Sequence, residues 1–114
     1  MAGILELCAK RRRYPVELED GETVYVRSLL HEEIETVRTI GDELSLPFVI
    51  GKCLVDLSGQ PALPQANSDE LPKDWAARVA AIIKQWPADT TMQLRMSITK
   101  VTLEPSREKL EKKS

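Results

Sequence analysis

The sequence predicts an α+β domain in which an N-terminal β-hairpin is followed by a small helical region. Three observations carry this prediction. Two short alternating runs flank an Asp-Gly pair between Tyr14 and Arg27. After Arg27 the apolar residues recur at helical spacing instead. Further along, the segment from Trp75 to Trp86 has the clearest amphipathic pattern in the chain.

The hairpin has two candidate registers. A two-residue Asp-Gly loop would place charged and apolar side chains together on one face. A loop over residues 19–21 instead pairs Val16 with Val24, so that the apolar side chains share a face. It requires Gly21 in a left-handed conformation, which glycine tolerates. We therefore predict the longer loop.

A helix is predicted directly after the hairpin. Ser28 is a candidate N-cap, and Leu30, Ile34 and Val37 follow at helical spacing. Gly41 is expected to loosen or end this helix, because glycine costs about 1 kcal/mol relative to alanine in a helix interior.

The next segment is strongly apolar. Pro47 suits the first turn of a second helix, and residues 48–55 are dense enough in apolar side chains for a short, nearly fully buried helix. A strand is the competing interpretation for so short a run. Residues 56–61 have turn composition, and residues 62–70 are predicted to form a loop, the best candidate for mobility.

The cleanest helix is expected from Pro72 to Trp86, with Pro87 ending it. Trp75 and Trp86 lie at helical spacing on its apolar side. Two tryptophans in this pattern are more often core anchors than a binding stripe, and we expect core anchors here.

Residues 92–103 admit two interpretations. Four apolar residues alternate with polar ones: Met92, Leu94, Met96 and Ile98. Alternation favours a C-terminal strand. A helix would group Leu94, Ile98 and Val101 but leave Met92 and Met96 poorly placed, so we favour the strand and keep the helix as the alternative. The predicted organisation is an N-terminal arm (1–13), one domain (14–103) and a charged tail (104–114).

Composition narrows the function. The formal net charge of −2 predicts no general attraction to phosphate or anionic membranes. No apolar run is long enough to cross a bilayer, and the apolar N-terminus lacks the preceding basic region of a signal peptide. We expect a cytoplasmic protein in which Cys8 and Cys53 are buried or half-buried thiols.

The basic run Lys-Arg-Arg-Arg at residues 10–13 has two interpretations. It is a candidate nucleic-acid patch, or a solvated arm that keeps the edge of the sheet from aggregating. Because the remainder is acidic and no aromatic residue is interleaved, we expect the solvated arm.

Motifs for catalysis are missing from the sequence. His31 is the only histidine and is expected to be a solvated surface residue. No phosphate-binding glycine loop is present, and the loop starting at Asp56 lacks the later ligands of a calcium site. We predict no catalytic, metal-binding or cofactor-binding residue, and therefore a binding module and not an enzyme.

The order of features resembles the tail assembly chaperones of long-tailed bacteriophages and prophages. The resemblance covers about residues 14–86: the hairpin at 16–27, a glutamate-rich helix, an apolar run ending in Cys-Leu-Val-Asp-Leu-Ser-Gly-Gln-Pro at 53–61, and the amphipathic helix at 75–86. It implies a protein that binds the long helical tape-measure protein in the host bacterial cytoplasm. The tape-measure protein is then the implied client and the tail-tube protein a further partner. Self-association is compatible with this role.

The candidate partner-binding residues are Leu29, Leu30, Ile34 and Val37, with the loop at 61–72 as a rim. The alternative is that these four side chains belong to the core. Two rival functions are a structural head–tail or tail protein of the virion and a nucleic-acid-binding regulator that uses residues 10–13.

Overall fold

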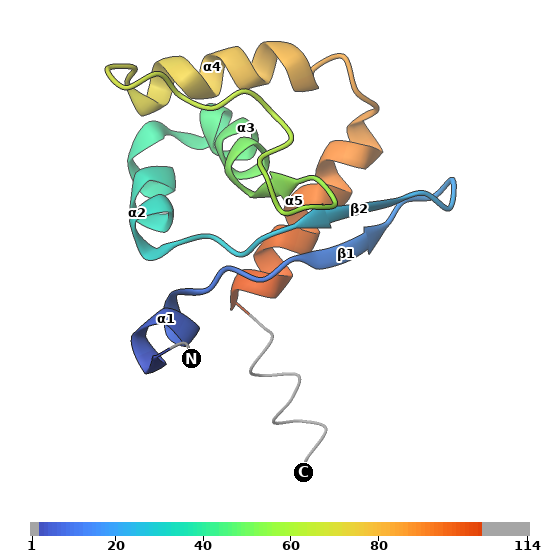
Figure 1. Cartoon of the computed structure of the whole chain (residues 1–114). Helices are drawn as coiled ribbons and strands as arrows, with labels where there is room; N and C mark the ends of the chain where they lie inside the picture. The colour runs from blue at the N-terminus through green and yellow to red at the C-terminus, as the bar shows by residue number, and fades with distance from the viewer. Residues whose placement is uncertain (1–2, 104–114) are drawn as a thin grey trace.

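The computed structural model describes residues 3–103 and confirms the α+β class (Figure 1). Within these residues a three-stranded antiparallel sheet, of order β1-β2-β3, lies beside five helices. The elements are α1 (Ile4–Ala9), β1 (Tyr14–Glu17), β2 (Thr23–Val26), α2 (His31–Ile40), α3 (Asp42–Cys53), β3 (Leu54–Val55), α4 (Pro72–Ile83) and α5 (Ala88–Leu103).

The hairpin has the predicted three-residue register. Val16 pairs with Val24, and Tyr14 with Val26. Gly21 has a φ of 88°, and its N–H donates to the carbonyl oxygen of Leu18 at 2.9 Å. Val16 is buried, so the apolar face of the hairpin is directed to the core, as the register argument requires.

The apolar run at 48–55 contains both elements that the sequence left open. It is helical as far as Cys53, and Leu54–Val55 then form β3, which pairs with β2 through Val26. This short strand was not separately predicted. It covers the edge of β2, which would otherwise present unpaired backbone groups.

The starts of α2 and α3 differ from the prediction. α2 begins at His31 and not near Ser28, because the Glu33 carboxylate accepts a hydrogen bond from the Leu30 N–H at 2.8 Å and satisfies a free donor of the first turn. α3 begins at Asp42, directly after Gly41 (φ 95°), so Pro47 lies inside this helix and not in its first turn. Gly41 separates the two helices as predicted.

The core is centred on α3, which packs against α4, α5 and α2. Trp75 of α4 is 1% exposed and meets the ring of Phe48 edge-on, at 5.6 Å between centroids. The core-anchor prediction is therefore confirmed for Trp75. Trp86 lies beyond the end of α4 and is half-buried against the core.

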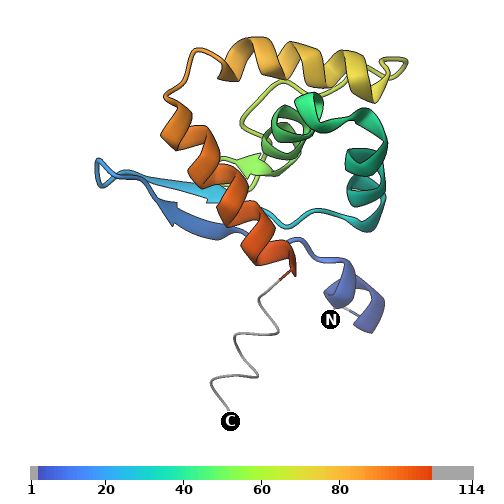
Figure 2. The ribbon, with the colours of Figure 1, turned by 180° about the vertical axis from the view of Figure 1, so that it is seen from behind.

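The favoured strand at residues 92–103 is wrong, because this segment belongs to α5. Figure 2 shows α5, in orange, crossing in front of the hairpin. Leu94 and Ile98 are buried, whereas Met92 and Met96 are 51% and 68% exposed. The alternation in the sequence therefore comes from two apolar stripes on opposite sides of one helix, and not from the two faces of a strand.

Hydrogen bonds fix both ends of α5 to the N-terminal half of the chain. The Leu29 N–H donates to the Thr102 hydroxyl at 2.9 Å, and the Gln93 side-chain amide donates to the Glu17 carbonyl oxygen at 2.6 Å. These bonds join residues far apart in sequence, and no local pattern could have indicated them.

The predicted arm at residues 1–13 contains α1, a six-residue helix with no buried residue. Figure 1 shows it at the margin of the molecule. The predicted charged tail at 104–114 lies outside the described residues. Among residues 3–103 no helix combines the length and the apolar character needed to cross a membrane.

Candidate partner-binding surface

The four residues predicted to bind a partner lie at and beside α2. Leu30 is 38% exposed, and Leu29, Ile34 and Val37 are half-buried. Leu30 directly precedes α2 in an extended conformation, and Ile34 and Val37 share one side of the helix by their spacing. Leu29 and Val37 also pack against the core, so much of their apolar area is already covered.

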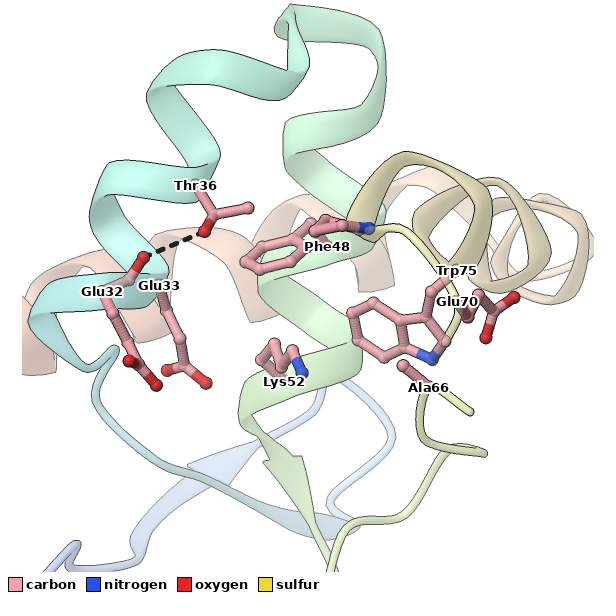
Figure 3. Close-up of a pocket in the computed structure, with 9 residues that line it drawn as sticks. Glu32, Glu33, Thr36, Phe48, Lys52, Ala66, Glu70 and Trp75 are labelled. Carbon is pink, nitrogen blue, oxygen red and sulfur yellow. Dashed lines mark hydrogen bonds between the residues drawn. The ribbon is translucent and has the colours of Figure 1, made fainter. Parts of the chain in front are cut away.

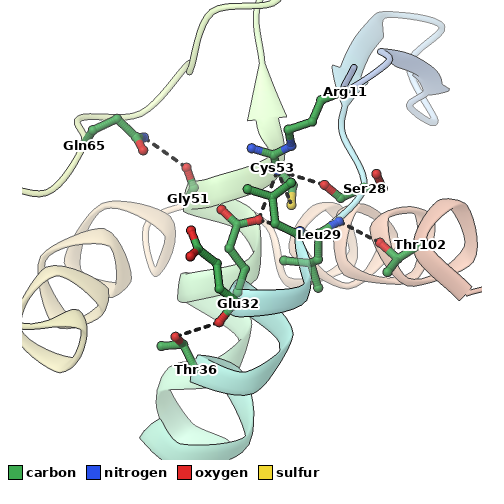
Figure 4. A network of polar contacts seen from close by, with 11 residues as sticks. Arg11, Ser28, Leu29, Glu32, Thr36, Gly51, Cys53, Gln65 and Thr102 are labelled. Atoms are coloured by element: carbon green, nitrogen blue, oxygen red, sulfur yellow. Dashed lines mark hydrogen bonds and ion pairs between the residues drawn. The ribbon is translucent and has the colours of Figure 1, made fainter. Parts of the chain in front are cut away.

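Arg11 links the basic run to the base of α2 (Figure 4). Its guanidinium donates to the Ser28 carbonyl oxygen at 2.8 Å and to the Glu33 carboxylate at 3.1 Å. The side chains of Arg11 and Glu33 are only 20% and 10% exposed. The expected solvated arm is therefore wrong for Arg11, which the buried carboxylate of Glu33 draws into the fold, whereas Arg12 is exposed.

Replacing Arg11 with alanine is expected to lower the free energy of unfolding by about 2 kcal/mol. The change would leave the Glu33 carboxylate largely buried without its cationic partner. Arg12→Ala is the matched control and should change stability by less than about 0.5 kcal/mol. Urea unfolding of both variants measures the difference, and equal losses would contradict the role of Arg11.

Cys8 and Cys53 have different environments. Cys53 is buried beside the Arg11–Glu33 pair, and burial, followed by the nearby charge of Glu33, raises the pKa of its thiol to about 12. Cys8 is exposed on α1, so the expectation that it would be buried or half-buried is wrong. The reason is that none of the residues of α1 is buried.

Thiol labelling should therefore distinguish the two cysteines. In a Cys8→Ser variant at pH 8, Cys53 should react at least about 100-fold more slowly in the folded protein than in denaturant, because the thiolate is the reactive form. A Cys53→Ser variant should be labelled readily while folded. Comparable rates for Cys53 in the folded and unfolded chains would contradict this assignment.

A cleft of about 290 Å³ lies between α2, α3 and the beginning of α4 (Figure 3). The Lys52 ammonium lies 4.6 Å from the ring centroid of Trp75 and 5.8 Å from that of Phe48. Both distances permit a cation–π interaction. Glu32, Glu33 and Glu70 line the cleft around this cation.

Most polar groups of this cleft already have partners in the protein. Glu70 binds Arg78 through two hydrogen bonds of 2.7 Å, and these bonds lower the pKa of its carboxyl group. Glu33 is paired with Arg11, and the Thr36 hydroxyl donates to the Glu32 carbonyl oxygen. These bonds hold the loop against α4 through Glu70 and Arg78, and the segment before β1 against α2 through Arg11 and Glu33.

The loop between β3 and α4 is anchored at this cleft. The indole N–H of Trp75 donates to the Pro64 carbonyl oxygen at 2.9 Å, and the Gln65 amide donates to the Gly51 carbonyl oxygen at 3.2 Å. Ala66 and Glu70 place the loop on the rim of the cleft, across from α2. The structure thus brings together the predicted helix and the predicted rim, but through the polar side of α2 and not through the four apolar residues predicted to bind a partner.

His31 is the first residue of α2 and is exposed, as predicted. Across residues 3–103 no group of histidine, cysteine, aspartate or glutamate side chains is arranged to hold a metal ion.

The sequence analysis missed the exposed side of α5. Met92, Met96 and Leu103 are 51%, 68% and 68% exposed and follow one another along the outside of the helix. A shallow groove runs along this side, lined by Met92, Arg95, Met96, Ser97, Thr99 and Lys100. The sequence does carry a signal for this side of the helix, because Met92 and Met96 are four residues apart, as are Leu94 and Ile98. The two pairs interleave, so together they produce the alternation that favours a strand.

α1 presents a second exposed apolar surface. Ile4, Leu5 and Leu7 are 78%, 85% and 49% exposed. α1 and the outside of α5 therefore both expose large apolar side chains that the core does not bury. Contiguous exposed apolar surface of this kind is typical of binding surfaces.

Comparison of the chain with protein-family models, with characterised proteins and with solved structures gave no match. The assignment of function therefore depends on the residues themselves and on their arrangement.

Proposed function

We propose that this protein is a tail assembly chaperone of a long-tailed bacteriophage or prophage. In this role it binds the tape-measure protein in the host cytoplasm and keeps it soluble until the tail tube assembles around it. The action is binding and not catalysis.

The observation that carries this proposal is the exposed apolar stripe on α5. A holdase needs apolar surface that its own core does not use, and Met92 and Met96 supply flexible side chains that adapt to different partner surfaces. The resemblance over residues 14–86 supplies the identity of the client. Weak binding repeated at many sites along a long helical client would give a stable coat.

The direct test is co-expression with the long helical protein that is encoded downstream. A tag on the chaperone should recover the tape-measure protein, and the soluble fraction of that protein should rise relative to expression alone. If the tape-measure protein is soluble without this partner and does not co-purify, the proposal is wrong.

The same experiment does not separate a chaperone from a structural protein of the virion. Mass spectrometry of mature particles does so, because a chaperone leaves before the tail is complete. Detection of this chain at the level of other tail proteins would favour the structural role. The nucleic-acid alternative is not favoured by the position of Arg11, which is held between Ser28 and Glu33.

A further inference from the structure

The exposed stripe of α5 has the spacing of a coiled-coil seam. Met92, Met96, Thr99 and Leu103 are separated by four, three and four residues, which is the order of alternating d and a positions in a heptad repeat. Three of these side chains are large, apolar and at least half exposed. The stripe is about 17 Å long at the rise of an α-helix, enough for three turns of a partner helix.

The flanks of this seam are basic. In the same heptad frame Arg95 and Lys100 occupy the g and e positions, one on each side of the stripe, and both line the groove. Within residues 3–103 Arg95 has no ion-pair partner. In coiled coils the residues at these two positions select the partner by charge.

We propose that the outer face of α5, which consists of this groove and Leu103 next to it, binds an amphipathic helix whose apolar stripe is flanked by glutamate or aspartate. The inference rests on the proposed chaperone function and names the chemistry of the client segment. Acidic side chains beside the client's stripe would lie against Arg95 and Lys100, while its apolar residues pack between the two methionines.

Charge argues against a second copy of α5 as the occupant. In a parallel pair Arg95 of one copy would face Lys100 of the other, and in an antiparallel pair each would face its own equivalent. Either arrangement brings like charges together, which disfavours the pairing.

The other apolar segments of this chain fit the groove less well. α1 has six residues and is about 9 Å long, roughly half the length of the stripe. Residues 104–114 contain one large apolar side chain, Leu110, and cannot supply a stripe. A helix from another protein is therefore the occupant that the chemistry favours.

Two synthetic helices test the proposal on the full chain. Each has about three heptads with leucine at a and d, and they differ only in having glutamate or lysine at e and g. Fluorescence anisotropy should show that the glutamate peptide binds at least roughly tenfold more tightly than the lysine peptide. Raising the salt from about 50 mM to about 500 mM should narrow that difference, since exposed charges are screened.

Substitutions in α5 test whether the peptide binds to this face of the helix. Met92→Gln combined with Met96→Gln should weaken binding of the glutamate peptide at least tenfold, and Arg95→Glu should reduce the preference for it. The matched controls are Leu57→Gln, an exposed leucine in a turn, and Lys73→Glu, an exposed lysine at the start of α4. Both controls should bind like the unchanged protein.

Three results would overturn the proposal. They are equal binding of the two peptides, equal weakening by Lys73→Glu and Arg95→Glu, and self-association of the protein that Met96→Gln abolishes.

Co-expression separates this proposal from the function on which it rests. If the Met92→Gln, Met96→Gln protein still solubilises the tape-measure protein, the groove assignment is wrong and the chaperone function stands. If the tape-measure protein is not bound but the glutamate peptide binds α5 with the expected variant pattern, the docking chemistry stands and the client is a different protein.

Discussion

Replacing Trp75 with alanine is expected to lower the free energy of unfolding by about 3–5 kcal/mol, the largest effect of any single substitution considered for this chain. The side chain is 1% exposed and joins α4 to α3 through its edge-on contact with Phe48. Its indole N–H also holds the loop through the Pro64 carbonyl oxygen. The substitution therefore removes apolar packing, a ring contact and the anchor of the loop together.

Urea unfolding followed by circular dichroism measures this loss without depending on tryptophan fluorescence. Trp86→Ala is the matched control, since Trp86 is half-buried beyond the end of α4. Trp86→Ala should lower the free energy of unfolding by clearly less than Trp75→Ala does. If the two variants lose similar stability, Trp75 is not the principal anchor of the core.

The second large effect is expected at Gly51. A Cβ atom there would lie 2.7 Å and 2.9 Å from two carbons of the Trp75 ring and 3.1 Å from a methyl carbon of Val79. The absence of a side chain thus permits the close approach of α3 and α4. Gly51→Val should destabilise the fold by about 2–3 kcal/mol, as overpacking in a well-filled core does.

Gly3→Val is the control for Gly51, because nothing lies within 4 Å of a Cβ atom at Gly3. It should change stability by less than about 0.5 kcal/mol. Combining Gly51→Val with Trp75→Phe, which removes part of the clashing ring system, should cost less than the sum of the single changes. Strict additivity would show that Gly51 and Trp75 do not compete for the same space.

The N-terminal half of the domain was largely readable from local patterns. The register of the hairpin followed from the position of Gly21 and from keeping Val16 and Val24 on one face, and the structure has that register. The boundary between α2 and α3 is also local, because glycine is unfavourable inside a helix. In the structure Gly41 has a φ of 95°, which glycine adopts without strain.

The starts of α2 and α3 were harder to predict, because residues other than the expected cap and the expected first-turn proline set them. Glu33 caps α2 at Leu30, so Ser28 is not needed as a cap and its carbonyl oxygen instead accepts a bond from Arg11. Proline generally prefers the first turn of a helix, which is why Pro47 is expected there, but Gly41 lets α3 begin five residues earlier, at Asp42.

The candidate partner surface was likewise only partly predictable from local sequence. The sequence shows that the four predicted residues at and beside α2 are apolar, but not that packing covers part of Leu29 and Val37. The exposed stripe of α5 was missed, because nothing local says which of two equally apolar stripes the core will use.

By itself, the sequence determined the α+β class, the hairpin and its register, the helix that carries Trp75, and the absence of known catalytic motifs from the chain. These depend on turn chemistry and on hydrophobic periodicity, which act within a few residues. The tertiary structure alone decided that residues 92–103 are helical and which stripe of α5 faces outward. Leu94 and Ile98 are buried against α3 and the sheet, and once that side is filled Met92 and Met96 must face away from the core.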